Sequence, residues 1–162
     1  MTKELKRSQA AAAKRIIKTA VKYSGKEALH GAWTDGNGYQ CVCSNYHAAR
    51  IREHLPELPE IQAHLDPVDF TKFYPLDRAK FELVLPSAAN LRAYIKDRKA
   101  AGEKTPVWDF GPSLPAVNAQ YLLDMLAILP GSLAYCEEGH PCTPIYFASF
   151  AGDGLLCPVR KK

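Results

Sequence analysis

Long hydrophobic runs are missing from this sequence. The longest apolar stretch, residues 121–129, is interrupted by Asp124 and is far shorter than the roughly 20 apolar residues of a membrane-spanning helix. The basic N-terminus is followed by only a short alanine run before Lys14, which is too brief and too weakly apolar for a signal peptide. We therefore expect a soluble, cytoplasmic protein that has no membrane partner.

A disulfide framework is also missing. The five cysteines are an odd number in a chain of 162 residues, and a chain of this length buries a core without covalent staples. Reduced thiols are therefore expected. The cysteines are Cys41, Cys43, Cys136, Cys142 and Cys157.

The cysteines and histidines do not show the spacing of common metal sites. Cys136, His140 and Cys142 lack the Cys-x2–4-Cys pairs of zinc ribbons and fingers, and Cys41 and Cys43 equally suit two small side chains buried on one strand face. No glycine-rich loop carries the helix and lysine of a phosphate-binding site. We expect no metal, no cofactor and no catalytic residues. A zinc site and a Cys/His nucleophile pair stay open, because sequence does not reveal proximity.

The chain does contain enough apolar material for one ordinary domain. Hydrophobic residues make up 47% of it and aromatic residues 10%, which offsets the entropy lost on ordering. We expect residues 1–162 to form a single domain with an irregular, acidic insertion at about residues 53–78. Prolines interrupt any regular pattern between Pro56 and Pro75, leaving room for one short helix.

Positive charge is concentrated at the N-terminus. Residues 1–26 contain eight Lys or Arg and one Glu, so they carry a net charge of +7, and the remainder carries −3 within the overall +4. Such an asymmetry suggests a polyanionic partner on one side of the molecule. The alternative is a solvated, lysine-rich terminal helix.

Three helices are predicted from periodicity and capping residues. The first spans residues 9–24, with Ser8 as its N-cap and Gly25 at its end. The second runs from the N-cap Ser87 to residue 101 and the third spans residues 118–129, with Asn118 as the N-cap. The buried stripe expected on the third comprises Leu122, Met125, Leu126 and Leu129.

Short strands separated by turns complete an α+β pattern. A hairpin is predicted at residues 28–34 and 39–44, around a turn at residues 35–38. Further strands are predicted at 81–85, 107–110, 133–136, 143–150 and 155–159, with turns at 138–141 and 152–154. Because a helix followed by a hairpin occurs in both the first and the last third, the two parts could join their sheets and place both helices on one face.

Two segments resemble the last domain of the bacterial DNA polymerase sliding clamp, the beta subunit. Residues 117–126 read Val-Asn-Ala-Gln-Tyr-Leu-Leu-Asp-Met-Leu, and residues 155–160 read Leu-Leu-Cys-Pro-Val-Arg. They are similar to the Asn-x-x-Tyr-Leu-Leu-Asp-x-Leu helix of that family and to its closing aliphatic-x-Pro-x-Arg strand. Residues 43–50 are similar to the clamp segment Ala-Thr-Asp-Gly-His-Arg-Leu-Ala, with Asn45 and Tyr46 in place of Asp-Gly. The resemblance implies a DNA-clamp-like α+β fold, with helices packed on one face of antiparallel sheets.

The resemblance also implies sequence-independent binding of duplex DNA. In sliding clamps the helices line a ring, and their Lys and Arg side chains face the phosphates, so binding is salt-sensitive. The resemblance implies that exposed Lys and Arg residues of the first two helices contact the phosphates here. These are Lys14, Arg15, Lys18, Lys22, Arg92, Lys96 and Lys99.

A second implied site is an apolar groove for short peptides of polymerases and other replication partners. Its matching positions are Ser44, His47, Leu155, Cys157, Pro158 and Val159. In the family these segments come from adjacent domains, so we expect the groove to form across a subunit contact in a homo-oligomer. The resemblance thus predicts a non-catalytic, DNA-associated or replication-protein-binding module. The alternatives are a clamp mimic without DNA binding and, third, a Cys/His enzyme.

Overall fold

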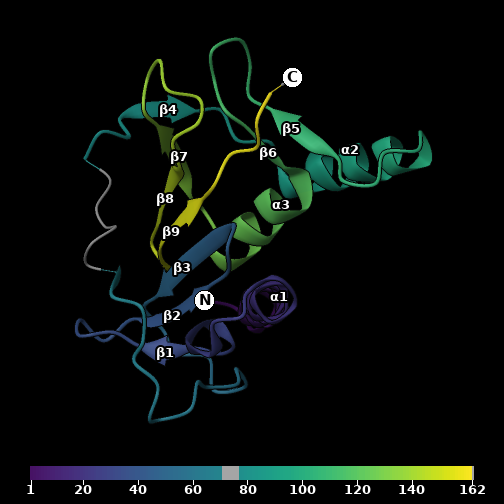
Figure 1. Cartoon of the computed structure of the whole chain (residues 1–162). Coiled ribbons are helices and arrows are strands. Elements are labelled where there is room, and N and C mark those ends of the chain that lie inside the picture. Colours follow the sequence, from purple (N-terminus) through teal and green to yellow (C-terminus); the bar gives the residue numbers. More distant parts are fainter. Residues whose placement is uncertain (71–76, 162) are drawn as a thin grey trace.

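A single antiparallel sheet of seven strands organises the chain. The structure is a computed structural model that describes residues 1–70 and 77–161. The strand order is β1-β2-β3-β9-β8-β7-β4, and Figure 1 shows the sheet extending from β1 to β4. The bounds are Trp33–Thr34 for β1, Gln40–Cys43 for β2, His47–Ile51 for β3, Phe81–Leu83 for β4, Leu133–Cys136 for β7, Ile145–Ser149 for β8 and Gly152–Leu156 for β9.

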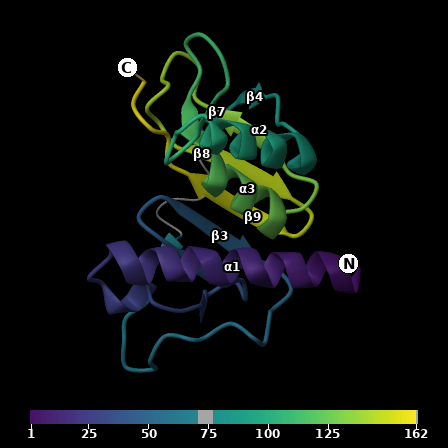
Figure 2. The same cartoon turned by 90° about the vertical axis from the view of Figure 1, so that its right-hand side faces the viewer.

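Three α-helices lie on one side of this sheet (Figure 2). They are α1 (Lys3–Tyr23), α2 (Ala88–Ala100) and α3 (Ala119–Ile128). The remaining elements are a short 3-10 helix, η1 (Glu27–Leu29), and a two-stranded sheet of β5 (Val107–Asp109) and β6 (Ala116–Asn118). The fold is therefore α+β, with helices covering one face of an antiparallel sheet, as expected.

Helix α1 forms because its apolar residues recur at helical spacing. Ala13, Ile16 and Ala20 are fully buried against the rest of the domain. The predicted N-cap Ser8 is wrong, because the helix begins at Lys3 and the Thr2 side chain accepts a hydrogen bond from the Leu5 N–H at 3.2 Å. Good helix formers between Thr2 and Ser8 allow this longer helix.

The other helix caps agree with the sequence. The Ser87 hydroxyl accepts a hydrogen bond from the Asn90 N–H at 3.1 Å. The Asn118 side chain accepts from the N–H groups of Gln120 and Tyr121 at 2.9 and 3.1 Å. Both caps satisfy N–H groups that a helix start leaves unpaired. Of the stripe expected on α3, Leu122, Met125 and Leu129 are fully buried, whereas Leu126 is half-buried.

The two halves of the chain join where β3 pairs with β9. The register places His47 opposite Leu156 and Ile51 opposite Gly152, so the expected joining of the two sheets is confirmed. The same pairing brings α1 beside α3 in antiparallel orientation, with the Gln9 side-chain amide donating to the Ile128 carbonyl at 2.9 Å. Both helices consequently share one face.

The boundaries of several strands differ from the predictions. Residues 27–29 form η1, so the expected strand at 28–34 is correct only at its end. Strands β3 and β6 were not predicted, since His-Ala-Ala-Arg-Ile and Ala-Val-Asn have weak strand propensity and are held by their neighbours.

The turn predicted at residues 152–154 is wrong, because these residues lie inside β9. The two glycines there, Gly152 and Gly154, allow the backbone of β9 to approach β3 and α3 closely. A Cβ on Gly152, whose φ is +148°, would lie 1.9 Å from the Arg50 carbonyl oxygen, and one on Gly154 would lie 2.5 Å from the Met125 methyl carbon and 2.8 Å from the Ala48 carbonyl oxygen. Glycine therefore lets β9 run against β3 and beneath α3.

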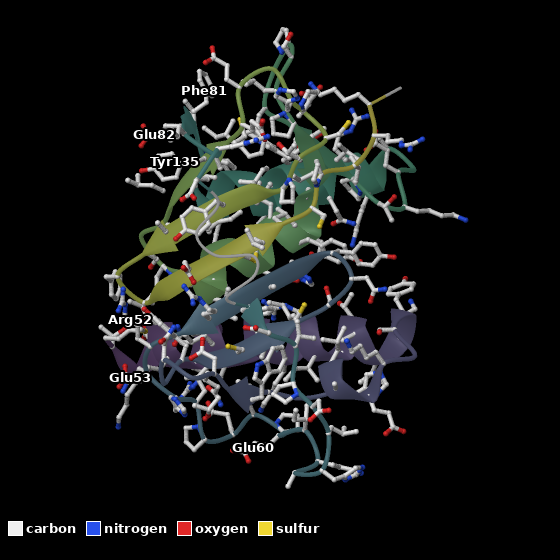
Figure 3. All side chains as sticks on the ribbon, turned by 60° about the vertical axis from the view of Figure 1, so that its left-hand side comes forward. Arg52, Glu53, Glu60, Phe81, Glu82 and Tyr135 are labelled. Atoms are coloured by element: carbon white, nitrogen blue, oxygen red, sulfur yellow. The ribbon has the colours of Figure 1, made fainter. Side chains whose placement is uncertain are left out.

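The segment after β3 covers one edge of the sheet. Residues 52–70 form no α-helix or named strand, and residues 71–76 of the proposed insertion lie outside the described residues. Pro59 accepts a hydrogen bond from the Ala32 N–H at 2.8 Å, and the Ile61 N–H donates to Ala32 at 3.0 Å. The backbone beside β1 is thus partly paired, which blunts an edge that could aggregate. At the opposite edge, Phe81 and Glu82 of β4 are exposed beside Tyr135 of β7 (Figure 3).

We predict that Gly154→Ala lowers the free energy of unfolding by about 1–3 kcal/mol, because the added methyl overpacks the contact between β9, Met125 and Ala48. Urea unfolding followed by circular dichroism measures the change. Gly36→Ala is the matched control, since no heavy atom lies within 4 Å of its would-be Cβ. Equal unfolding midpoints for the two variants would show that close packing does not require Gly154.

Candidate functional site: a basic helical face and an apolar pocket

The predicted DNA-binding residues are all exposed, and α1 and α2 carry them. Lys14, Lys18 and Lys22 follow one another at four-residue spacing and form a row along α1. Arg15 of α1 and Arg92 of α2 line one hollow of about 310 Å³, together with Gln120, Leu123 and Ala127 of α3. The fold therefore brings cations from two separate helices around α3.

Arg15 is held in place by a buried carboxylate. Its Nε donates to Oδ1 of Asp124 at 2.6 Å. The Asp124 side chain is only 3% exposed, whereas that of Arg15 is 45% exposed. The Gln120 amide also reaches the same oxygen, at 3.4 Å. Since Asp124 belongs to the Tyr-Leu-Leu-Asp helix, this motif residue fixes α3 to α1 and orients a guanidinium at the surface.

A polar chain continues from Asp124 into the sheet. His47 Nε2 lies 3.6 Å from the second oxygen of Asp124, and His47 Nδ1 lies 2.6 Å from the Ser44 hydroxyl oxygen. The Ser44 hydroxyl also accepts hydrogen bonds from the backbone N–H groups of Tyr46 and His47, each at 3.1 Å. These hydrogen bonds fix the conformation of the turn between β2 and β3. The polar residues thus extend from the basic face to the first residue of β3.

The opposite face of the sheet carries an apolar pocket of about 370 Å³. Cys43, Ala48 and Leu155 lie opposite one another on β2, β3 and β9, so their side chains point to one face. Gly154, the neighbour of Leu155, faces Met125 of α3 instead, which places the pocket away from the helices. The full lining is Lys26, Leu29, Cys43, Ser44, Asn45, Tyr46, His47, Ala48, Val68, Phe70, Pro144, Leu155 and Cys157.

Four of the six predicted peptide-binding residues line this pocket, namely Ser44, His47, Leu155 and Cys157. The His47 imidazole is itself fully buried, so it positions the turn and does not project outward. Pro158 and Val159 are not part of the lining. The Val159 N–H donates to the Ala116 carbonyl at 2.8 Å and ties the C-terminal segment to β6.

The expectation that the groove needs a subunit contact is wrong. The His-containing segment and the C-terminal strand are β3 and β9, which are hydrogen-bonded neighbours in one chain. A single copy therefore builds the whole pocket. The reason is that the first and the last third of the chain each contribute a helix and neighbouring strands to one sheet. The two segments therefore meet without a second subunit.

Several pocket residues could not be identified from the sequence. Val68 and Phe70 come from the proline-rich segment, which showed no regular pattern, and Phe70 is buried against Trp33 with ring centroids 5.2 Å apart. Lys26 lies just past the end of α1 and is part of the pocket lining. Only the apolar character of Val68 and Phe70 within an acidic stretch could have drawn attention to them.

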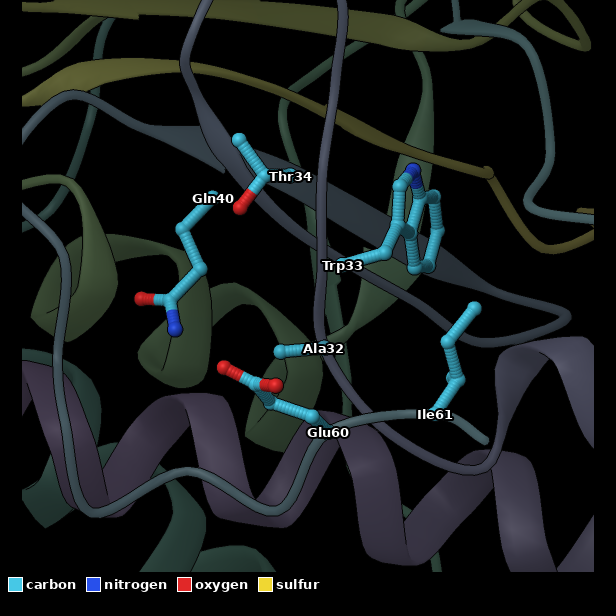
Figure 4. A pocket seen from close by; sticks show the side chains of 6 residues that line it. All are labelled: Ala32, Trp33, Thr34, Gln40, Glu60 and Ile61. Carbon is cyan, nitrogen blue, oxygen red and sulfur yellow. The ribbon is translucent and has the colours of Figure 1, made fainter. Parts of the chain in front are cut away.

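A smaller pocket of about 190 Å³ lies between the sheet edge and the segment after β3. Figure 4 shows its lining side chains, which come from β1, β2 and the crossing chain around Glu60. They are Ala32, Trp33, Thr34, Gln40, Glu60 and Ile61. This pocket adjoins the backbone contact that protects β1.

The cysteine chemistry left open by the sequence finds no support in the geometry. Across the described ranges, 1–70 and 77–161, no three His, Cys, Asp or Glu side chains come together as metal ligands. Burial raises the pKa of the Cys43 thiol to about 12 and also raises the pKa of Cys41. A raised pKa opposes the thiolate that a nucleophile needs. In the same ranges no helix is both long and apolar enough to cross a membrane.

No protein-family model matches the chain, and no curated protein matches it. Similarity to known proteins is therefore found in the structure and not in the sequence. Helices packed on one face of a joined antiparallel sheet, with an apolar pocket on the other, define a DNA-clamp-like α+β fold.

Solved structures that share this fold are bacterial sliding clamps. The Helicobacter pylori beta clamp bound to a DNA ligase peptide superposes with a TM-score of 0.61 at 13% identity, over 94% of this chain and 63% of the clamp chain. The beta subunit of Streptococcus pyogenes DNA polymerase gives 0.62 at 10% identity, and the C. crescentus beta sliding clamp gives 0.58 at 14% identity. Each of these two matches covers 94% of this chain and 64% of the other. The chain thus accounts for less than two thirds of each clamp, and it has the sliding-clamp fold.

We predict that Asp124→Ala destabilises the protein by about 2 kcal/mol, because it removes the charged hydrogen bond between the buried carboxylate and Arg15. Chemical denaturation measures the loss. The control is Glu53→Ala, which breaks the Lys6–Glu53 pair of 2.6 Å between half-exposed side chains and should hardly move the midpoint. Equal effects of the two substitutions would contradict a special role of the buried carboxylate.

Proposed function

We propose that this chain is a sliding-clamp-like, non-catalytic module of DNA replication that works in the cytoplasm. Its helical face associates with duplex DNA, and its pocket holds peptides of polymerases or other replication proteins. The observation that carries the proposal is the placement of the basic helices and the apolar pocket on opposite sides of one clamp-like sheet.

The basic face suits a polyanion of uniform charge. The amines of Lys14, Lys18 and Lys22 lie along one side of α1, at intervals of about 6 Å along the helix axis. Glu4 is the single acidic residue of α1. Arg15 is anchored, whereas the lysines are exposed and reach outward. Such a row contacts phosphates and not bases, so it supports sequence-independent binding.

The pocket suits an apolar peptide of partner proteins. Its lining is mainly aliphatic and aromatic, including Leu29, Phe70 and Leu155, and it opens beside polar groups of the β2–β3 turn. Its volume of about 370 Å³ accommodates a few apolar side chains. The clamp of Helicobacter pylori is described with a bound DNA ligase peptide, which supports this class of partner.

A clamp mimic is the second candidate, and one observation favours it. Because β3 and β9 build the pocket within one chain, peptide binding requires no ring. A ring around DNA would need further copies of the chain, so self-association belongs to the first proposal only. The two candidates therefore differ in their dependence on the basic face.

We predict that Lys14→Glu/Lys18→Glu weakens binding of a random duplex at least about tenfold at about 50 mM salt, since two phosphate contacts are lost. Fluorescence anisotropy across a salt series should show the slope of log K against log salt falling by about 2. The matched control is Arg78→Glu/Lys80→Glu, which makes the same charge change near β4, where both residues are exposed. Absence of duplex binding by the unaltered protein at low salt, with peptide binding intact, would establish the mimic instead.

We predict that the DNA ligase peptide bound by the Helicobacter pylori clamp protects Cys157 from maleimide labelling, because this exposed thiol lines the pocket. Mass spectrometry measures labelling at each cysteine. Cys142 is also exposed but is not part of the pocket, so its labelling serves as an internal control and should not change. Leu155→Asp should abolish protection, since it places a charge on the apolar wall. Equal protection of both cysteines would rule out pocket binding.

A further inference from the structure

Three tyrosines from separate elements meet where α1 ends and α3 begins. Tyr23 is the last residue of α1, Tyr46 lies in the turn before β3, and Tyr121 lies in the first turn of α3. The Tyr46 and Tyr121 rings are stacked, with centroids 5.4 Å apart and planes 19° from parallel. Tyr23 meets Tyr46 edge-on at 5.7 Å. We call these three residues the tyrosine cluster.

In the tyrosine cluster, Tyr121 is held by its neighbours, whereas Tyr46 and Tyr23 are exposed to solvent. Tyr121 is half-buried and packs on the His47 ring at a centroid distance of 4.6 Å. Tyr46 is 37% exposed and Tyr23 is 50% exposed. Rings held in place by their neighbours lose little entropy when another flat group stacks on them. The exposed parts of the Tyr23 and Tyr46 rings are therefore aromatic surface that a partner can reach.

Positive charge lies beside the exposed Tyr23 ring. The Lys22 Nζ lies 5.1 Å from the centroid of the Tyr23 ring. Lys18 lies one helical turn before Lys22, and Lys26 follows the end of α1. The sequence from Lys18 to Lys26 contains no acidic residue. The lysine row along α1 therefore ends on the tyrosine cluster.

We propose that the tyrosine cluster is a binding site for single-stranded nucleic acid, in which unpaired bases stack on Tyr23 and Tyr46 while phosphates contact Lys18, Lys22 and Lys26. Exposed aromatic rings beside amines are the combination that binds single strands without sequence preference. A duplex keeps its bases stacked inside and makes no use of these rings. The tyrosine cluster adjoins the apolar pocket, whose lining includes Tyr46 and Lys26 but not Tyr23, and the lysines beside the rings favour an anion.

This site is distinct from the proposed duplex-binding face and lies next to it. Because the lysine row leads directly to the tyrosine cluster, a duplex on α1 and a single strand on the rings would meet as one junction. The two sites are separable in experiment, since the cluster uses base stacking and the row uses charge alone.

The test compares a labelled oligothymidylate of about 12 nucleotides, a size within the range that single-strand sites cover, with a duplex of equal length by fluorescence anisotropy. Tyr23→Ala should weaken single-strand binding about tenfold and change duplex binding less than about twofold. Tyr23→Phe should bind normally, because stacking needs the ring and not the hydroxyl. The control is Phe150→Ala, which removes an aromatic ring that is 64% exposed at the turn between β8 and β9 and should have no effect.

An abasic strand of the same length provides the decisive comparison, since it keeps the phosphates and removes the bases. The unaltered protein should bind it more weakly than oligothymidylate, and Tyr23→Ala should bind both alike. Equal affinity of the unaltered protein for the two strands would overturn the proposal, as would an equal loss of duplex and single-strand binding in Tyr23→Ala. Tyrosine-dependent binding of single strands without duplex binding would support this site and overturn the duplex proposal.

Discussion

Pairing between β3 and β9 is the interaction on which the rest of this structure depends. It joins strands β1–β3 from the first third of the chain to β7–β9 from the last third, with β4 at the far edge. Gly152 and Gly154 make the pairing feasible, because any side chain there would collide with the β3 backbone. The join sets α1 beside α3 on one face and completes the apolar pocket on the other. Both proposed binding surfaces are therefore consequences of one strand contact.

A buried polar chain runs across this join. Ser44, His47 and Asp124 connect the end of β3 to Arg15 at the helical surface, through contacts of 2.6, 3.6 and 2.6 Å. Hydrogen bonds hold His47 to Ser44 and Asp124 to Arg15, whereas His47 Nε2 faces Asp124 at a distance beyond hydrogen bonding. The chain thereby fixes the turn beside the pocket, the register of α3 against α1 and the position of a surface cation together.

The sequence indicated the helices well because their signals are local. Ser87 and Asn118 were identified as N-caps from residue type alone, and both make the expected hydrogen bonds. The strands were harder, since β3 is held by pairing on both sides and not by its own propensity. The glycines of β9 were interpreted as a turn because close approach and turn formation require the same residue. The predicted clamp-like fold is nonetheless confirmed, because solved sliding clamps superpose on 94% of this chain.

The sequence by itself determined the α+β class, the three helices and the concentration of positive charge on α1, since capping, periodicity and charge are properties of neighbouring residues. Only the tertiary structure decided that β3 and β9 meet within one chain, that Arg15 and Arg92 share a hollow and that Tyr23, Tyr46 and Tyr121 form one cluster. Those juxtapositions join residues as many as 109 positions apart, as in the pairing of His47 of β3 with Leu156 of β9. Packing of whole elements fixes such contacts, and no local pattern encodes them.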